Sequence, residues 1–308
     1  MRPRKTRIHC GLVGDRTLVG SSYLSRPDLR QEYQSEIAPR TEAALRRILG
    51  QVQLEPQRPR RVLDLGAGTG AVARALRGCF GEDVELVAVD RVAGPGILVA
   101  DVLRGVRPAG VRGCFDLIVA AHLLNELGRS LNLDGRAQLV AGWCRELLEP
   151  DGTCIVIEPA LRDTSRALLG VRDRLLVAGL HLLAPCLCQT ACPALQRDRD
   201  WCHDSAEVLI AGRSRVDFSY LILRQSGTKE VDRNRYRVVS DPLKDKGRLR
   251  FFVCGVAGRF VLMRLDRDRS AANQALDRMC RGDIVVLPNV LVQDDGIRIA
   301  VESTVGIG

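Results

Sequence analysis

The chain has 308 residues, 46% of them apolar, which is enough for one large domain with appendages or for two domains with buried cores. Its formal net charge of +9 permits a nucleic-acid partner without demonstrating one. No apolar run reaches the roughly 18–20 residues that cross a bilayer, and the basic N-terminus lacks a signal-peptide core. The sequence therefore predicts neither a membrane protein nor a secreted one. Eleven cysteines without an export signal also argue against a disulfide framework.

The first 56 residues are predicted to form an N-terminal helical segment. From Tyr23 onward the apolar spacing indicates two helical pieces, broken at Pro39. Residues 53–61 are polar and marked by proline, so we expect them to link this segment to the first strand of the next domain.

Residues 61–70, RVLDLGAGTG, predict a buried strand that runs into a glycine-rich turn and then a helix. Gly66, Gly68 and Gly70 allow a sharp turn and let a ligand approach the backbone, which a Cβ would prevent. The N-terminal amides of the following helix would face the same spot. Because glycine turns follow many strands, this motif alone leaves a plain strand-to-helix connection open.

Carboxylates mark the ends of the neighbouring strands. Asp64 lies in the first strand, two residues before the first glycine. The second strand, 84–89, is followed by Asp90, 20 residues after the last glycine, where a carboxylate that holds ribose hydroxyls is expected. A third apolar run, 97–100, is followed by Asp101. This alternation predicts a doubly wound α/β sheet with its ligand at the carboxyl ends of the strands.

The pattern resembles the class I S-adenosylmethionine-dependent methyltransferases, whose first motif reads like LDLGAGTG. A dinucleotide-dehydrogenase fingerprint would place the third glycine one residue later. The resemblance implies a Rossmann-like methyltransferase domain, expected over residues 57–225. It also implies that S-adenosylmethionine lies over the glycine turn, with Asp90 on the ribose and Asp101 near the adenine. The predicted cofactor-binding residues are Asp64, Gly66, Gly68, Gly70, Asp90 and Asp101.

The rest of this domain is predicted to continue as alternating strands and helices. The segment HLLNEL lacks the Pro-Pro-aromatic or Pro-Cys signatures of many nitrogen- or cytosine-modifying enzymes. Asn125 and Glu126 within it are interpreted as helix-start caps or as residues that position a nucleophile, and no catalytic residue is assigned. Cys79, Cys114, Cys144 and Cys154 are expected to be buried small hydrophobes. The predicted elements are a strand at 115–121, a helix at 134–148, a strand at 153–158, helices at 161–184 and 205–213, and a strand at 216–224.

Four cysteines crowd a loop at residues 184–203, namely Cys186, Cys188, Cys192 and Cys202. Thiolates gathered on an irregular loop suit a soft metal centre, because the loop can fold around the metal. The spacing does not decide between zinc and iron–sulfur. His203 is a candidate zinc ligand or a donor to a ligand cysteine.

Residues 226–308 are predicted to form a small, basic, antiparallel β module. Residues 221–270 carry 13 Lys+Arg against 6 Asp+Glu. Basic residues interleaved with Tyr236, Phe251, Phe252 and Phe260 are typical of a nucleic-acid surface, although a solvated face of a β module fits equally well. The predicted elements are strands at 235–240, 248–254 and 258–264 and a short helix at 271–281.

Three stretches together carry a more specific resemblance. They are APRTEAALRRIL before VLDLGAGTG, then VIEPALRDTSRALLGVRDRLL, and finally APC-x5-CP…DWCH followed by FSYLIL and FFVCG. From about Tyr23 to Asp283 the chain is similar to the methyltransferase-like proteins of the mitochondrial small ribosomal subunit and their bacterial relatives.

This resemblance implies a four-iron four-sulfur cluster held by Cys186, Cys192, Cys202 and Cys254, with Cys188 as an alternative ligand. It implies a partner in the small ribosomal subunit and its rRNA, not DNA or a membrane. The location would be the cytoplasm of a bacterium, or the mitochondrion of a eukaryote. Methyl transfer to the rRNA, a non-catalytic assembly or translation role, and methylation of a small molecule remain open.

Overall fold

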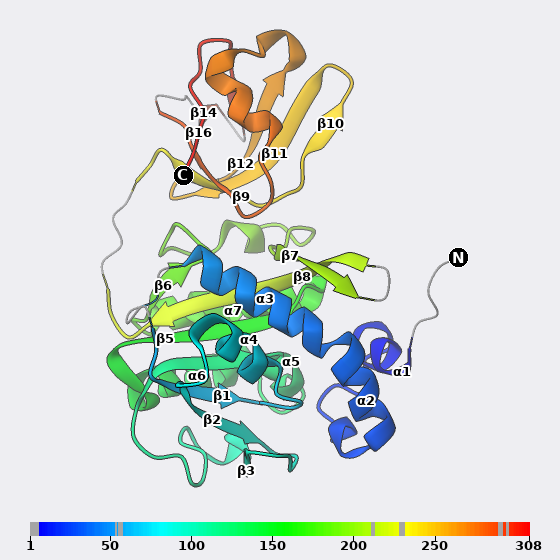
Figure 1. The fold of residues 1–308 in the computed structure, drawn as a ribbon. Helices are drawn as coiled ribbons and strands as arrows, with labels where there is room; N and C mark the ends of the chain where they lie inside the picture. Colours follow the sequence, from blue (N-terminus) through cyan, green and yellow to red (C-terminus); the bar gives the residue numbers. More distant parts are fainter. Residues whose placement is uncertain are drawn as a thin grey trace.

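The computed structural model describes residues 6–52, 54, 58–210, 213–227, 232–288, 292–293 and 296–308. It shows two lobes, a larger lower one and a smaller upper one (Figure 1). Among the described residues, no helix has the length and apolar character needed to span a bilayer.

The lower lobe is built on an eight-stranded sheet with the order β3-β2-β1-β4-β5-β8-β6, in which β7 also pairs with β8. The strands from β3 to β5 are parallel, whereas β6 and β7 pair antiparallel to β8, and β8 pairs antiparallel to β5. The strands are β1 (Arg61–Leu65), β2 (Glu85–Asp90), β3 (Ile97–Val99), β4 (Phe115–Ala121), β5 (Leu148–Pro159), β6 (His181–Ala184), β7 (Asp204–Ile210) and β8 (Arg213–Arg224).

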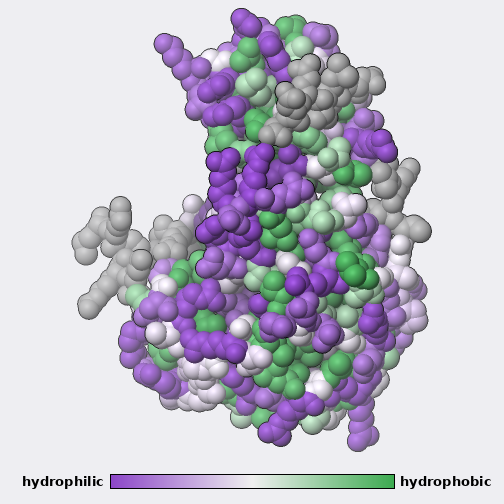
Figure 2. Space-filling model, turned by 180° about the vertical axis from the view of Figure 1, so that it is seen from behind, coloured by the Kyte–Doolittle hydropathy of each residue, from purple (hydrophilic) through white to green (hydrophobic). Residues whose placement is uncertain are grey.

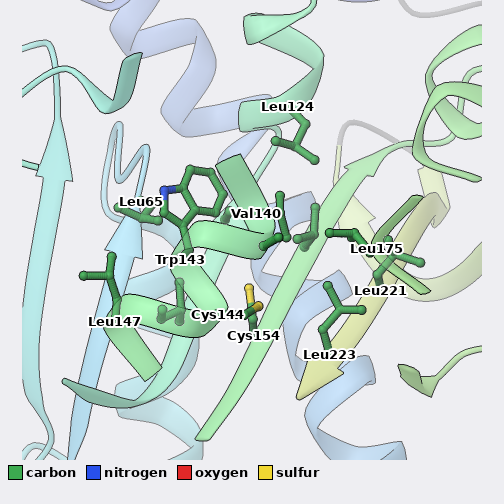
Figure 3. Packing of buried hydrophobic residues seen from close by; sticks show 14 of the residues in the cluster. Leu65, Leu124, Val140, Trp143, Cys144, Leu147, Cys154, Leu175, Leu221 and Leu223 are labelled. Carbon is green, nitrogen blue, oxygen red and sulfur yellow. The ribbon is translucent and has the colours of Figure 1, made fainter. Parts of the chain in front are cut away.

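Helices cover both faces of this sheet, as the doubly wound prediction requires. One hydrophobic cluster joins the sheet to α6 and α7, and a second joins its other face to α3 and α4. Figure 3 shows the first cluster, where Trp143 and Cys144 of α6 pack near Cys154 of β5. The helices are α1 (Arg7–His9), α2 (Pro27–Glu36), α3 (Ala38–Gln51), α4 (Ala71–Phe80), α5 (Leu123–Leu127), α6 (Leu133–Leu147) and α7 (Arg162–Val177).

Short helical turns complete the lower lobe. The break between α2 and α3 falls at Ile37, two residues before the predicted Pro39, which lies in the first turn of α3. The turns are η1 (Cys10–Gly14), η2 (Tyr23–Ser25), η3 (Val102–Arg104) and η4 (Pro193–Leu195).

Two predicted elements of this lobe are wrong. The segment expected to be a helix at 205–213 is instead part of strand β7, which pairs antiparallel with β8 and whose more buried and less buried side chains alternate from Asp204 to Leu209. The helix expected at 161–184 ends at Val177, because Gly179 adopts φ +86° and its N–H bonds back to Leu176. The chain then turns and forms β6 against β8.

The expectation for the four core cysteines holds for two of them. Cys144 and Cys154 are fully buried. Cys79 is exposed, because it lies in the last turn of α4 beyond Leu76, the last buried residue of that helix. Cys114 is half-buried in the loop before β4.

The upper lobe is a second eight-stranded sheet with the order β14-β15-β12-β11-β9-β13-β16, in which β10 pairs with β11. Its pairs are antiparallel, as predicted, except that β12 and β15 are parallel. The helix expected at 271–281 is a 3₁₀ turn, η6 (Ala271–Asp277). The strands are β9 (Arg235–Val238), β10 (Leu243–Asp245), β11 (Arg248–Gly255), β12 (Gly258–Leu265), β13 (Ile284–Val286), β14 (Val292–Gln293), β15 (Gly296–Ile299) and β16 (Gly306–Ile307).

A buried ion pair links the two lobes. The guanidinium of Arg237 on β9 lies 2.5 Å from a carboxyl oxygen of Asp204 on β7, and both side chains are almost completely buried. A more exposed pair, Arg215–Asp241 at 3.0 Å, joins β8 to the segment after β9.

Candidate functional site

The glycine turn after β1 adopts the backbone that its sequence predicts. Gly66, Gly68 and Gly70 have φ values of +79°, +53° and +79°, in the left-handed region that favours glycine. The N–H groups of Gly66 and Ala67 donate to the carbonyl of Val89 at 2.9 and 3.0 Å. The turn is thereby held against the end of β2.

Asp90 closes the other side of the same turn. Its Oδ2 accepts the N–H of Gly68 at 2.8 Å, and its Oδ1 accepts that of Val92 at 2.8 Å. A carboxylate has about four acceptor positions, so capacity for a ligand's hydroxyls remains. Asp101 accepts the N–H of Leu103 at 2.9 Å and so starts η3.

Between these groups lies a cavity of about 120 Å³. Of the predicted cofactor residues, Gly66, Gly68, Asp90 and Asp101 line it together. Asp64 and Gly70 do not line it, because Asp64 points into the core and Gly70 caps the N-terminus of α4.

Asp64 is fully buried, and neither of its carboxyl oxygens has a hydrogen-bond partner among the described residues. Burial, followed by the negative charge of Asp90, raises the pKa of Asp64 to about 8. The group is therefore mostly protonated at neutral pH.

The N-terminal segment covers this cavity, which the sequence reasoning did not foresee. Gly20, Tyr23 and Tyr33 line it from that side. Glu126 ties the segment down, since its Oε1 accepts the hydroxyl of Tyr23 at 2.9 Å and its Oε2 accepts the N–H of Gly20 at 3.1 Å. The only sequence feature that could have indicated this covering was the spacing of Tyr23 and Tyr33. The same spacing fits the buried face of a helix equally well.

His122 follows strand β4 and lines the cavity, and Glu158 lies near the end of the adjacent strand β5. His122 has φ +60°, and its Nε2 lies 3.1 Å from the hydroxyl of Thr41. Burial lowers the pKa of His122 to about 4, so its imidazole is neutral at pH 7. Glu158 accepts the N–H groups of Leu124 and Asn125 at 2.9 and 3.0 Å.

The cap at the start of α5 therefore belongs to Glu158, not to Asn125 or Glu126 as the sequence suggested. Burial raises the pKa of Glu158 to about 8. The side chain of Asn125 instead accepts a hydrogen bond from Arg16. No signal in the sequence separates these roles, because they depend on how β5 and the N-terminal segment pack around α5.

A second site lies at the junction of the two lobes. The four predicted metal ligands line one cavity of about 40 Å³, together with Cys188. Three come from the loop between β6 and β7, and the fourth comes from β11 of the upper lobe. Burial raises the pKa of the thiols of Cys186, Cys192 and Cys254, to about 12 for Cys192.

Arginines surround these thiols. Arg172, Arg237 and Arg259 line the same cavity. Arg172 is fully buried, donates to the carbonyls of Cys188 and Thr190 at 2.8 and 2.6 Å, and lies 3.6 Å from the Cys188 sulfur. Such cations offset the charge of thiolates, which burial alone disfavours.

The donor chemistry of this cavity fits the predicted group. Five thiols, one more than a cluster needs as ligands, and three guanidinium groups line one small cavity, and this combination suits an anionic cluster with thiolate ligands. Within the described part of the chain, no three His, Cys, Asp or Glu side chains already stand in an arrangement that holds a metal ion. The fit of this cavity to a cluster therefore rests on the type of ligand and on the convergence of the thiols on one place.

The order of the lower sheet, with five parallel strands continued by the antiparallel β8, defines the class I methyltransferase fold. A family profile described as mitochondrial small ribosomal subunit Rsm22 matches residues 30–281. The chain belongs to the Rsm22 family.

Solved structures similar to the chain include methyltransferases and a cofactor-bound protein. The N-methyltransferase NodS from Bradyrhizobium japonicum WM9, in complex with S-adenosylhomocysteine, is 16% identical, with 66% of this chain and 94% of that chain covered and a TM-score of 0.42. The plantazolicin methyltransferase BamL is 12% identical over 67% and 94%, with a TM-score of 0.44. Cofactor-bound Rv0187 from MTB is 14% identical over 71% and 95%, with a TM-score of 0.36. No curated protein sequence matches the chain.

Proposed function

We propose that this protein binds S-adenosylmethionine in the cleft beside the glycine turn and acts as a methyltransferase on the small ribosomal subunit and its rRNA. The observation that carries the cofactor proposal is the bond between Gly68 and Asp90 across the cleft. This bond holds the backbone of the glycine turn and the carboxylate of Asp90 beside the same small cavity. Membership of the Rsm22 family, whose name refers to the mitochondrial small ribosomal subunit, supports the choice of partner.

The chain's own residues would divide the work of binding. The backbone of Gly66 and Gly68 leaves room for the ligand, because a Cβ on either would stand 3.3 Å from a leucine side chain. The open acceptor positions of Asp90 suit ribose hydroxyls, and Asp101 lies where the adenine is expected. When bound, S-adenosylmethionine supplies an electrophilic methyl group. Holding the acceptor in line with that group accounts for much of the rate without a dedicated acid or base.

The cavity at the lobe junction is proposed to hold a four-iron four-sulfur cluster. Cys186, Cys192, Cys202 and Cys254 would be its ligands, and Cys188 is the alternative to any one of them. The arginines around the cavity favour an anionic cluster over a neutral site. Zinc on the same thiolates is the competing assignment.

A non-catalytic role in subunit assembly or translation is the second candidate. It is favoured by the N-terminal segment, which Glu126 ties over the cleft through two hydrogen bonds. A cover of this kind restricts the entry of an acceptor. In this reading the methyltransferase fold is a platform for binding, in the cytoplasm of a bacterium or in the mitochondrion of a eukaryote.

The deciding experiment measures methyl transfer. Protein purified without oxygen is incubated with methyl-labelled S-adenosylmethionine and immature small subunits from a strain that lacks the protein. Label at one rRNA position would establish the enzyme. Cofactor and subunit binding without label would establish the assembly role instead.

Two matched variants test the cofactor cleft. Asp90→Ala should weaken S-adenosylmethionine binding by about 1–3 kcal/mol, the cost of losing charged hydrogen bonds. Asp83→Ala serves as the control, because the side chain of Asp83 is 90% exposed and pairs only with Arg58 at 3.2 Å in the described structure. Equal affinity of both variants in calorimetry would show that the cofactor binds elsewhere.

A further inference from the structure

One face of the upper sheet is not part of the upper core. Along β11, Leu249, Phe251 and Val253 are buried in that core. The alternate residues Arg248, Arg250 and Phe252 point to the opposite face, which ends at Cys254 and the cysteine cavity. This strand therefore presents two arginines and then an aromatic ring on its outer side.

The aromatic ring lines a groove between the two lobes. The groove has a volume of about 230 Å³, with Phe252, Arg259 and Val261 on the side of the upper sheet. Arg197 and Asp200 line it from the cysteine loop. Figure 2 shows hydrophilic side chains gathered at the waist between the lobes. The groove therefore combines an aromatic floor with walls that carry two arginines and one aspartate.

The Phe252 ring is held in place before any ligand arrives. The guanidinium carbon of Arg259 lies 5.2 Å from the ring centroid, a cation–π contact. Arg259 in turn donates to the carbonyl of Trp201 at 3.4 Å, and the N–H of Phe252 donates to the hydroxyl of Ser240 at 2.8 Å. A ring fixed in this way loses little freedom when a flat group stacks on it.

The charges along β11 favour a polyanion. Arg248 and Arg250 share a single carboxylate, that of Asp245, and the Arg248–Asp245 distance is 3.3 Å. One of the two positive charges is therefore left over for a partner. Residues 221–270 as a whole carry 13 Lys+Arg against 6 Asp+Glu. An acidic peptide would satisfy the arginines, but it offers no flat group for the groove.

We propose that a single strand of RNA binds across β11, with one base stacked on Phe252 in the groove and the adjoining phosphates on Arg250 and Arg248. Aromatic rings beside a basic track are how proteins hold single-stranded nucleic acid. This inference rests on the proposed association with rRNA and adds the form of RNA and the residues that hold it. It places the strand beside the cysteine cavity and outside the cofactor cleft.

The test is fluorescence anisotropy of the full-length, iron-loaded protein with a labelled 12-nucleotide single-stranded RNA of mixed sequence. Phe252→Leu should weaken binding about 5-fold or more, the range for the loss of one stacked base. Phe252→Tyr, which keeps an aromatic face, should bind like the wild type. Iron content and melting temperature, measured on both variants, show that each is folded.

The arginine track is tested by the salt dependence of binding. The double variant Arg248→Gln/Arg250→Gln should bind more weakly and reduce the slope of log K against log salt by about 1.4, or 0.7 for each phosphate contact on a single strand. Phe252→Leu should leave that slope unchanged. The control is Arg58→Gln/Arg77→Gln, which removes two exposed, ion-paired arginines from the lower lobe and should change neither quantity.

The outcomes separate the inference from the function on which it rests. A wild-type protein that binds no RNA would contradict the rRNA partner itself. RNA binding that is unchanged in both the Phe252→Leu and the arginine variants would place RNA elsewhere and overturn this inference alone. Equal affinity for a 12-base-pair duplex would also overturn it, because paired bases cannot enter the groove.

Discussion

The cofactor cleft and the cysteine cavity are built in opposite ways. The predicted ligand-binding groups of the cleft lie within residues 66–101 and are joined by short-range contacts, such as the bond between Gly68 and Asp90, while other segments of the same lobe complete its lining. The cysteine cavity joins Cys186 to Cys254, which lie 68 positions apart and in different lobes. The first site is thus a property of one lobe, whereas the second exists only while the lobes are docked. A perturbation of the junction should therefore damage the cysteine site and spare the cleft.

The largest expected effect follows from removing the one ligand that the upper lobe contributes. Cys254→Ser should reduce bound iron to background, because a hydroxyl is a poor replacement for a buried thiolate ligand. S-adenosylmethionine affinity should stay within about twofold of the wild type, since Cys254 does not line the cleft. Iron analysis and calorimetry on anaerobically purified protein measure the two quantities.

The matched control is Cys280→Ser, which changes an exposed cysteine of the same lobe. It should keep its iron. Wild-type iron content in Cys254→Ser would identify another fourth ligand, and Cys188, which lines the same cavity, would be the next residue to replace.

The next largest effect concerns the ion pair between the lobes. Asp204→Asn leaves the buried guanidinium of Arg237 without its counter-charge, and breaking such a pair costs about 3–5 kcal/mol. Denaturant unfolding should show this loss, with the upper lobe unfolding first if the two transitions separate. The control Asp217→Asn breaks an exposed pair with Arg215 and should cost less than about 1 kcal/mol. Equal losses in the two variants would mean that the buried pair does not hold the lobes together.

The comparison also explains what the sequence could and could not predict. The glycine turn and the acid after β2 were predictable, because local spacing determines both the left-handed backbone and the position of Asp90. The role of Glu126 was not, because it depends on Tyr23, which lies 103 positions away. The convergence of Cys254 with the loop cysteines came from the family resemblance alone, since no local pattern links β11 to that loop.

The wrong elements have the same origin. The apolar residues of 205–213 follow neither a helical nor a strand period clearly, and local propensity favoured a helix. In the structure, pairing with β8 makes this segment a strand. The assignment of Asp64 to the cofactor site stays a prediction. Its side chain does not line the cavity and is fully buried, without a hydrogen-bond partner among the described residues.

The smallest expected effect sharpens this last point. The pKa of Asp64 is raised to about 8 in the folded protein, against about 3.9 in an unfolded chain. Between these values the native state keeps a proton that the unfolded state has released. The stabilisation is therefore fully present below about pH 4 and is lost as the pH rises toward 8. Asp64→Asn removes this titration, so its free energy of unfolding should fall about 3–4 kcal/mol less than that of the wild type between pH 5 and 8. Glu158, whose pKa is also raised to about 8, remains in the variant and keeps part of the dependence of stability on pH.

The exposed control Asp83→Asn should show the same dependence of stability on pH as the wild type. If Asp64→Asn also showed that dependence, Asp64 would be ionised in the folded protein.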